Sequence, residues 1–420
     1  MAAAVERSGG SCGKKRKRAA SGLADLHDDM LERVLARLPP SSYFRLRGVS
    51  RRWRAAADSN TFRAACARVP PRDPWFLMLQ EDQDQQQQTV LVPARPAAAV
   101  FDSAERAWAR WRGAPGHAPV AAAGGLVLYR DPATGDLTVV NPLTGASRAL
   151  PPPPPSPSAL QAIAMYGSPY RVVLIMGELP DLSMATFDST KNAWEGAVPL
   201  ARKAEGDEAS PRERAAEEGE DASGDDAVYF LSKSGDVVAT TMQRSASRQY
   251  SCSVACRAGA GEDAVAYFLS RSGTVVACDL ARRAFAELPR ILPAYHEYSI
   301  DVVACGGAAY AVVLSEFLDA ASLRVWEHDA GGAWRQVAAM PPAMAHAFRG
   351  AKADVNCVGH GDRVVVCVSF GDAAARGCFV CDVRTNTWEE LPPLAGGDGE
   401  DAATGFVAAL SFEPRMEAAV

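Results

Sequence analysis

Two cysteine pairs are the residues whose types and spacing best suit chemistry. Cys378-Phe-Val-Cys381 and Cys252-x-x-x-Cys256 have the close spacing of zinc ligands or redox-active thiols. A structural zinc ion needs four ligands, and the six histidines form no matching local cluster. Residues three apart in a β-strand point to opposite faces, so Cys378 and Cys381 cannot share a metal without a turn between them. We therefore expect small buried side chains, free thiols, and no metal or other cofactor.

Motifs of nucleophilic and phosphate chemistry are also missing. Gly167-Ser168-Pro169 is not a nucleophile elbow of the Gly-x-Ser-x-Gly type, and no Gly-x-x-x-x-Gly-Lys phosphate loop occurs. Catalytic groups can lie far apart in a sequence, so missing motifs do not exclude an enzyme. The prediction is a protein without catalytic residues.

Basic residues gather in two places. Lys14-Lys15-Arg16-Lys17-Arg18 fits a nuclear-import signal, a solvated basic tail or, less well, a nucleic-acid arm. Arg47, Arg51 and Arg54 are of the type that grips phosphates, and Trp53 beside them is of the type that stacks on a base. The helical period places Trp53 opposite these arginines, which favours a buried anchor with a solvated basic rim.

Charge and hydropathy exclude further classes. The formal net charge of the 420 residues is -6, but residues 205–226 alone carry ten acidic and two basic side chains, so the remainder sums to about +2. We infer no strong field for nucleic acid or an anionic membrane. No apolar run reaches the length that crosses a bilayer, and the N-terminus lacks the apolar segment of a signal peptide. We expect a soluble intracellular protein, in the nucleus, the cytoplasm or both.

The elements that would position functional residues begin with a short amphipathic helix. Met30, Leu31, Val34, Leu35 and Leu38 form one apolar stripe on a 3.6-residue period. Asp25, Asp28 and Asp29 supply a cap and negative charge at its start, and Pro39-Pro40 ends it.

Two more short helices are predicted after that proline pair. Ser41 or Ser42 caps one that carries Tyr43, Phe44 and Leu46, and another begins near Gly48 with Val49, Trp53 and Ala56 on one side. Three helices in about 40 residues cannot enclose a self-sufficient core. A partner, or the rest of the chain, must cover the apolar face.

This stretch resembles the F-box, the helical motif by which adaptor proteins dock on Skp1. The usual Leu-Pro at its start is Leu26-His27 here. The resemblance implies a Skp1-like partner, cullin and RING subunits reached through it, and an unidentified target protein. The residues expected to bind Skp1 are Leu26, Met30, Leu31, Val34, Leu35, Leu38, Pro39, Val49 and Trp53, and the pattern continues to Phe62.

A loose repeat of about 40 to 55 residues occupies the rest of the chain. Each unit has an Asp or Asn at a strand end, a polar turn, an aromatic or apolar residue and often Leu-Pro or Met-Pro. The units start at Asp102, Asn141, Asp188, Asp279, Asp329 and Asp382. The segment from Tyr229 to Ala239 recurs as Tyr267 to Ala277, so the long gap after Asp188 has room for two units.

Short strands at this spacing predict a β-propeller of six or seven blades after the small all-α module. Gly306-Gly307, with Gly124-Gly125 as a weaker echo, resembles the double glycine of kelch repeats. The order of the parts is similar to the F-box/kelch family of plants. A propeller needs a closed ring, so the strand within Thr404–Pro414 is predicted to complete a blade begun near Trp75 or Ala97.

The predicted organisation has five parts. They are a disordered basic tail (1–21), the helical module (22–66), a proline-rich connector into the first strand (67–79), the propeller (80–415) with a disordered acidic insertion (202–226), and a C-terminal tail (416–420). Ser210 in the insertion is either a phosphorylation site or part of a solvated loop, and Pro151 to Pro155 is either a PPII ligand or an inter-blade loop.

The function that the resemblance implies is target recognition for a Skp1-cullin-F-box ubiquitin ligase, with no chemistry on this chain. The rival from another class is a kelch-like nuclear scaffold or transcriptional cofactor without a ligase role. An enzyme that uses the propeller channel is the third possibility. The target-binding residues cannot be read from the sequence.

Overall fold

The structure is a computed structural model of the full chain. It describes residues 27–48, 50–57, 59–80, 98–111, 117–203, 227–231, 237–241, 252–256, 264–270, 274–291, 298–317, 320–329, 331–348, 353–370, 376–392 and 406–420. The chain divides into a helical unit (Met1–Leu38 and Ser42–Val69) and a β unit (Pro70–Val420, with which Pro39–Ser41 groups).

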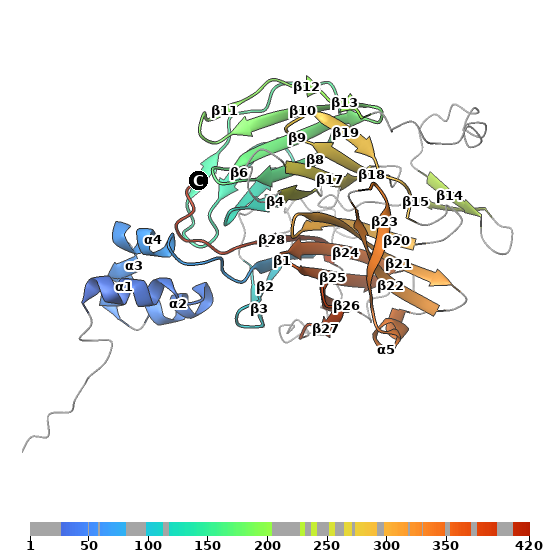
Figure 1. The fold of residues 1–420 in the computed structure, drawn as a ribbon. Coiled ribbons are helices and arrows are strands. Elements are labelled where there is room, and N and C mark those ends of the chain that lie inside the picture. The colour runs from blue at the N-terminus through green and yellow to red at the C-terminus, as the bar shows by residue number, and fades with distance from the viewer. Residues whose placement is uncertain are drawn as a thin grey trace, which may run out of the picture. The chain divides into compact units, whose positions relative to one another are not determined.

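The helical unit contains one more helix than predicted. Its four helices are α1 (Asp28–Ala36), α2 (Pro40–Arg47), α3 (Arg51–Ala57) and α4 (Asn60–Cys66) (Figure 1). The missed helix, α4, begins after Ser59, whose hydroxyl accepts a hydrogen bond from the Phe62 amide at 2.9 Å. That is a regular N-cap, which the sequence displays as Ser-x-x-Phe.

Two predicted helix starts were wrong in detail. The backbone of His27 caps α1 without a side-chain hydrogen bond, while Asp28 and Asp29 lie in its first turn as expected. Pro40 is the first residue of α2, so Ser41 and Ser42 lie inside the helix instead of capping it. Proline suits this position because the first helical N–H has no intrahelical partner to lose.

The β unit is a propeller, as predicted, and it has six blades. The main strands of each blade pair antiparallel. In blades 2 to 6 the first of these strands in the chain is innermost, and in blade 1 the innermost strand is β28. Blade 1 is β28 (Phe406–Phe412), β1 (Trp75–Gln80), β2 (Ala98–Asp102) and β3 (Ala107–Arg110). Blade 2 is β4 (Ala118–Ala123), β5 (Leu126–Arg130), β6 (Leu137–Val140) and β7 (Ser147–Ala149). Blade 3 is β8 (Leu160–Tyr166), β9 (Arg171–Glu178), β10 (Asp181–Asp188), β11 (Ala193–Trp194) and β12 (Val198–Pro199).

The other three blades follow in chain order. Blade 4 is β16 (Ser253–Cys256), β17 (Ala264–Leu269), β18 (Val275–Asp279) and β19 (Ala284–Glu287), with β13 (Ala201–Arg202) parallel to β19 at its edge. Blade 5 is β20 (Tyr298–Cys305), β21 (Ala308–Phe317), β22 (Ala320–His328) and β23 (Trp334–Ala339). Helix α5 (Pro342–Ala345) and a 3-10 turn, η4 (His346–Phe348), lead to blade 6, which is β24 (Ala353–His360), β25 (Arg363–Phe370), β26 (Arg376–Asp382) and β27 (Thr387–Glu390).

The ring closes as the sequence predicted. Strand β28, from the end of the chain, pairs antiparallel with β1, and Leu410 lies opposite Leu77 (Figure 1). The innermost strands neighbour one another in the order β28, β4, β8, β16, β20, β24 and back to β28. Blade 1 therefore joins two distant parts of the chain, and β1, which would otherwise be its innermost strand, is paired on both sides by β28 and β2.

The residues after β28 pack on blade 2. The side-chain amide of Asn141 donates hydrogen bonds to the carbonyl oxygens of Arg415 and Ala418, at 3.0 and 2.9 Å. Ala418 and Val420 pack against the core between blades 2 and 3. The last residues thus tie blade 1 to its neighbour beyond the paired strand.

The recurrent Asp or Asn has the same structural role in all six blades. It is the last residue of the third strand or the residue directly after it. Its side-chain oxygen accepts hydrogen bonds from backbone amides two to four residues further on, as Asp382 does from Arg384 and Thr385 at 3.0 Å. A left-handed residue follows, such as Asn386 with φ 53°. Asp and Asn favour such turns because a short side chain bonds its own backbone. The six residues are Asp102, Asn141, Asp188, Asp279, Asp329 and Asp382.

The double glycines also occupy equivalent places. Gly124-Gly125 joins β4 to β5, Gly306-Gly307 joins β20 to β21, and all four have positive φ. Two-residue hairpin loops of this kind require positive φ at both positions, which glycine adopts without steric cost. The kelch subtype itself stays a prediction.

The long gap after Asp188 contributes one blade to the propeller, so six is the observed one of the two predicted blade counts. The second copy of the duplicated segment forms β17 and β18 of blade 4, but the first forms β14 (Ala227–Leu231) and β15 (Val237–Thr241), a separate two-stranded sheet. Thr241 stands in the first copy where Asp279 stands in the second. An Asp at this position is what begins the turn into the outer strand of blade 4, and the first copy does not carry it.

Several predictions lie outside the described residues. These are the basic run Lys14–Arg18, Leu26, Val49 and residues 204–226 of the acidic insertion, with Ser210. The insertion was predicted to begin at 202, but Arg202 belongs to strand β13. Pro151 to Pro155 does lie between blades, after β7 and before β8, as predicted. In the part of the chain that the structure describes, no helix is long and apolar enough to span a membrane.

Candidate functional site

Helix α1 has two apolar rows, one buried and one exposed. Leu31 and Leu35 have no exposed surface, and Ala36 has 1%. Met30 and Val34 are 48% and 39% exposed, and they are the exposed large apolar side chains among the residues that the structure describes. Residues four apart lie on one helix face, so Met30 and Val34 form a continuous apolar patch, here called the Met30/Val34 patch.

The buried row packs inside the helical unit. Leu31 and Leu35 belong to a helix that contacts α3 and α4, and Phe62 and Cys66 of α4 are each 1% exposed. Tyr43 of α2 stacks on Phe62 with ring centroids 5.3 Å apart. This small core holds α1 by its inner face and leaves the outer face free.

A buried carboxylate fixes how α1 meets α4. Glu32 is 8% exposed, and its Oε1 accepts hydrogen bonds from the hydroxyls of Ser59, at 2.8 Å, and Thr61, at 3.0 Å. Ser59 accepts in turn from the Phe62 amide, so its hydroxyl uses both its donor and an acceptor site. Buried charged groups need such partners, and this one orients the helix that carries the Met30/Val34 patch.

The remaining residues predicted to bind Skp1 are half-buried or outside the described range. Leu38, Pro39 and Trp53 are half-buried, while Leu26 and Val49 are not among the described residues. The apolar stripe predicted on α1 is thus divided between the core of the helical unit and the surface. Leu31 and Leu35 follow Met30 and Val34 by one residue, and one residue turns a helix by about 100°, which moves them from the surface to the core.

The helical unit also exposes basic residues. Of the basic rim predicted at Arg47, Arg51 and Arg54, Arg51 and Arg54 are exposed, whereas Arg47 is half-buried. Arg52 pairs with Asp28 at 2.7 Å, but their side chains are 36% and 74% exposed. An ion pair this exposed contributes little to stability.

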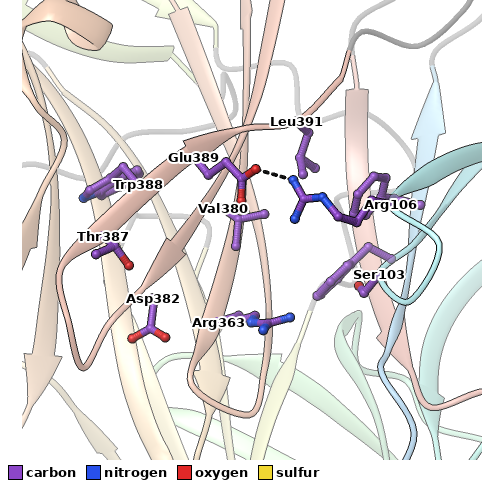
Figure 2. Close-up of a pocket in the computed structure, with 11 residues that line it drawn as sticks. Ser103, Arg106, Arg363, Val380, Asp382, Thr387, Trp388, Glu389 and Leu391 are labelled. Atoms are coloured by element: carbon purple, nitrogen blue, oxygen red, sulfur yellow. Dashed lines mark hydrogen bonds and ion pairs between the residues drawn. The ribbon is translucent and has the colours of Figure 1, made fainter.

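The propeller has a cavity of about 460 Å³ between blades 1 and 6 (Figure 2). Its apolar wall includes Phe76, Phe101 and Leu391. Arg106, in the turn of blade 1, forms an ion pair with Glu389 of blade 6. The further charged residues of the lining are Arg363 and Asp382, so positive and negative charges balance and the charge of the lining selects no ligand.

Six of the nine described cysteines are buried, but the prediction of buried side chains was wrong for Cys256, which is exposed, and Cys252 and Cys378 are half-buried. Cys381 lies in the core between blades 5 and 6, whereas Cys378, three residues earlier, packs toward blade 1. The prediction that they face opposite sides of a strand is confirmed. Burial raises the pKa of the Cys278, Cys305 and Cys381 thiols to about 12, so these thiols stay protonated near neutral pH.

All nine described cysteines are free thiols. Among the described residues, no three or more His, Cys, Asp or Glu side chains lie close enough to hold a metal ion.

Known proteins resemble this chain both in its helical unit and over nearly its whole length. The F-box domain family matches residues 23–64. F-box only protein 13 of Arabidopsis thaliana is 41% identical over 414 residues, which covers 94% of this chain and 85% of that protein. F-box only protein 6 of the same plant is 29% identical over 133 residues, or 29% of this chain and 25% of that protein.

Among solved structures, TolB from Acinetobacter baumannii covers 86% of this chain and 73% of its own at 10% identity, with a TM-score of 0.40. A likeness this distant adds nothing to the fold described above. The identity to F-box only protein 13 extends through the helical unit and the propeller alike. The chain belongs to the F-box protein family.

Proposed function

We propose that this protein is the substrate-recognition subunit of a Skp1-cullin-F-box ubiquitin ligase. The observation that carries the proposal is the Met30/Val34 patch, on a helix whose other face is already filled. Complete burial of a fully exposed Met or Val side chain contributes about 1.5–3 kcal/mol. Met30 and Val34 are 48% and 39% exposed, so a partner that covers them gains roughly half of that for each. Both side chains belong to the F-box match, and a Skp1-type protein is the partner that the match implies.

Three other residues of the predicted Skp1-binding set are half-buried. Leu38, Pro39 and Trp53 keep part of their surface exposed, and Leu38 follows Val34 by four residues. Leu31 and Leu35 are fully buried, and we assign them to the fold of the helical unit instead of the interface. Apolar anchors at the centre of an interface commonly contribute most of its binding energy.

The propeller would hold the target protein. A closed ring of six blades is a rigid carrier, and its loops are free to differ in sequence without changing the sheets. In this role the chain needs no catalytic residue. It raises the local concentration of target lysines near a ubiquitin-charged enzyme that the cullin and RING subunits bring.

A binding assay with surface variants tests the proposal. Full-length protein and a Skp1-type partner are combined, and the Kd is measured for Met30→Glu, Val34→Glu and both together. A matched control is Ala64→Glu, which places the same charge at an exposed position of α4. We expect at least tenfold weaker binding for the double variant, a loss of about 1.4 kcal/mol or more, and unchanged binding for the control. Equal affinity for all variants would exclude the patch as the docking surface.

A second experiment separates the ligase role from a scaffold role. Proteins near the chain are labelled in cells with the proteasome blocked, for the native chain and for the Met30→Glu/Val34→Glu variant. A ligase receptor predicts that propeller partners carry ubiquitin with the native chain and lose it with the variant. Partners that remain bound and never carry ubiquitin would favour the nuclear scaffold or transcriptional cofactor.

Nuclear localisation is a separate proposal, based on the sequence of the basic run. Replacement of Lys14, Lys15, Arg16, Lys17 and Arg18 by alanine should move a fluorescent fusion from the nucleus to the cytoplasm. An unchanged distribution would leave the run as a solvated tail.

A further inference from the structure

Two cysteines of blade 6 lie directly opposite each other on neighbouring strands. Cys367 of β25 is the register partner of Cys378 of β26. Their Sγ atoms are 2.8 Å apart, closer than any ordinary contact between unbonded sulfurs. Directly opposed residues of an antiparallel pair have Cβ atoms about 4.5–5.5 Å apart, so a small adjustment brings them to the spacing that a disulfide requires.

We propose that Cys367 and Cys378 form a reversible intrachain disulfide when the protein meets a hydroperoxide. The site is a place of covalent modification within the propeller, independent of the Met30/Val34 patch. It differs from the spaced pairs that the sequence displays, because 367 and 378 are brought together by strand pairing.

The difference in burial of the two thiols sets the order of the steps. Cys367 has no exposed surface, whereas Cys378 is half-buried. The oxidant therefore reaches Cys378 first. The Cys378 sulfur attacks one peroxide oxygen as its thiol proton is released, an S–O bond forms and the O–O bond breaks. The departing hydroxide or alkoxide takes up a proton and leaves as water or alcohol, and Cys378 becomes a sulfenic acid.

The second step uses the buried thiol. The sulfur of Cys367 attacks the sulfur of Cys378, the S–S bond forms and the S–O bond breaks. The departing hydroxide takes the proton of the Cys367 thiol and leaves as water. In total two thiols lose two electrons and two protons, and one hydroperoxide is reduced.

The pair also touches the junction of the ring. The Cys367 thiol donates a hydrogen bond to the Met78 sulfur of blade 1 at 3.7 Å, and Cys378 packs against the same core. A disulfide removes that S–H donor and links β25 to β26. It encloses a short loop, so we expect an upward shift in the Tm of the propeller of about 2–4 °C.

Peptide mapping tests the proposal. Full-length protein is treated with hydrogen peroxide at neutral pH, remaining thiols are alkylated, and trypsin cuts after Arg376, which separates the two cysteines. We expect a cross-linked pair of peptides that contains Cys367 and Cys378, two hydrogen atoms lighter than the sum of its parts. Reduction with dithiothreitol should release both peptides.

Variants show that the link is specific. Cys367→Ser and Cys378→Ser should each abolish the cross-link, and Cys378→Ala repeats the test without a new hydroxyl. Cys381→Ser, on the opposite face of the same strand, should leave the cross-link unchanged. The Tm of each variant in reducing buffer is measured first and should lie within about 2–4 °C of the Tm of the native chain.

Two results would overturn the proposal. The first is that Cys367 and Cys378 are recovered as alkylated thiols after peroxide treatment. The same treatment must link cysteines in the urea-unfolded protein, which shows that the peroxide is active. The second is a stable sulfinic acid at Cys378 with Cys367 still reduced. Binding to a Skp1-type partner is measured in parallel and should be the same in both redox states, so either proposal can fail alone.

Discussion

The indole Nε1 of Trp108 in blade 1 donates a hydrogen bond to the carbonyl oxygen of Pro392 in blade 6, at 2.7 Å. The same relationship joins Trp194 to Pro151, at 2.7 Å, and Trp334 to Pro289, at 2.8 Å. Each tryptophan follows the Asp turn of one blade, and each proline follows the last strand of the preceding blade. The Asp, Trp and Leu-Pro of the sequence repeat are thus the parts of one inter-blade contact.

Loss of this contact should weaken the ring. Trp108→Phe keeps an aromatic ring beside Phe101 and removes the donor, so we expect a loss of about 0.5–1.5 kcal/mol in the free energy of unfolding. Trp388→Phe is the control, because its Nε1 donates within its own turn, to Asn386. Urea unfolding of both variants measures the difference. Equal losses would mean that the bond between blades adds nothing beyond the loss of an indole.

The Asp turns should make stability depend on acid pH. The hydroxyl and amide of Thr190 lower the pKa of Asp188, and the Thr385 amide lowers the pKa of Asp382. A carboxylate whose pKa is lowered by folding stabilises the protein fully above its unfolded pKa of about 3.9, and the contribution is lost as pH falls through the folded value. The Tm should therefore decrease as the pH is lowered below about 4.

Blade 2 suggests the matched variants for this prediction. It uses Asn141, whose oxygen accepts the same two amide hydrogen bonds without a charge. Asp382→Asn should keep most stability at pH 7 and weaken the acid dependence, whereas Asp382→Ala should lower the Tm at every pH. If the asparagine and alanine variants behave alike at pH 7, the side-chain acceptor is not what the turn requires.

Glu32 should stabilise the helical unit through its hydrogen bonds to Ser59 and Thr61. Glu32→Ala leaves the hydroxyls of Ser59 and Thr61 without their shared acceptor and opens a gap between α1 and α4. We expect a loss of about 1.5–3 kcal/mol, the range for hydrogen bonds to charged groups. Hydrogen exchange of the α1 and α4 amides measures it. Arg33→Ala, exposed on the same helix, is the control and should stay within about 0.5 kcal/mol of the native chain.

Alanine variants at two glycines distinguish the cost of a positive φ from the cost of a steric clash. A Cβ on Gly125 would lie 2.7 Å from the Cβ of Arg415, in the segment that packs on blade 2, and its φ is +86°. A Cβ on Gly145 would meet nothing within 4 Å, at φ +75°. Gly145→Ala should cost about 1 kcal/mol for the left-handed conformation alone. Gly125→Ala should lower the free energy of unfolding by more than Gly145→Ala does. Equal urea midpoints for the two variants would show that the segment around Arg415 moves aside without cost.

Much of this protein was readable from local patterns. The helix at 28–36, the F-box resemblance, the Asp-turn-aromatic repeat and the closing strand near the C-terminus were all predicted. Each depends on residues close together in the chain, where the helical period, turn chemistry and strand alternation act directly. Even the opposite faces of Cys378 and Cys381 followed from strand geometry.

Other features depend on which segments meet in space. Periodicity marks Met30, Leu31, Val34 and Leu35 as apolar, but the position of α4 decides that Leu31 and Leu35 are covered and Met30 and Val34 are not. Duplication alone suggested one blade too many, because a copied hairpin becomes a blade only when inner and outer strands pair with it.

The sequence by itself determined the order of a helical module and a repeated β unit, and the resemblance to the F-box family, although it did not reveal helix α4. The tertiary structure decided the exposed apolar patch, the count of six blades, the bonds from Trp to Pro between blades and the meeting of Cys367 with Cys378. The physical reason is the same in each case. Local patterns set the conformation of a segment, while burial and pairing depend on partners that are distant in the chain.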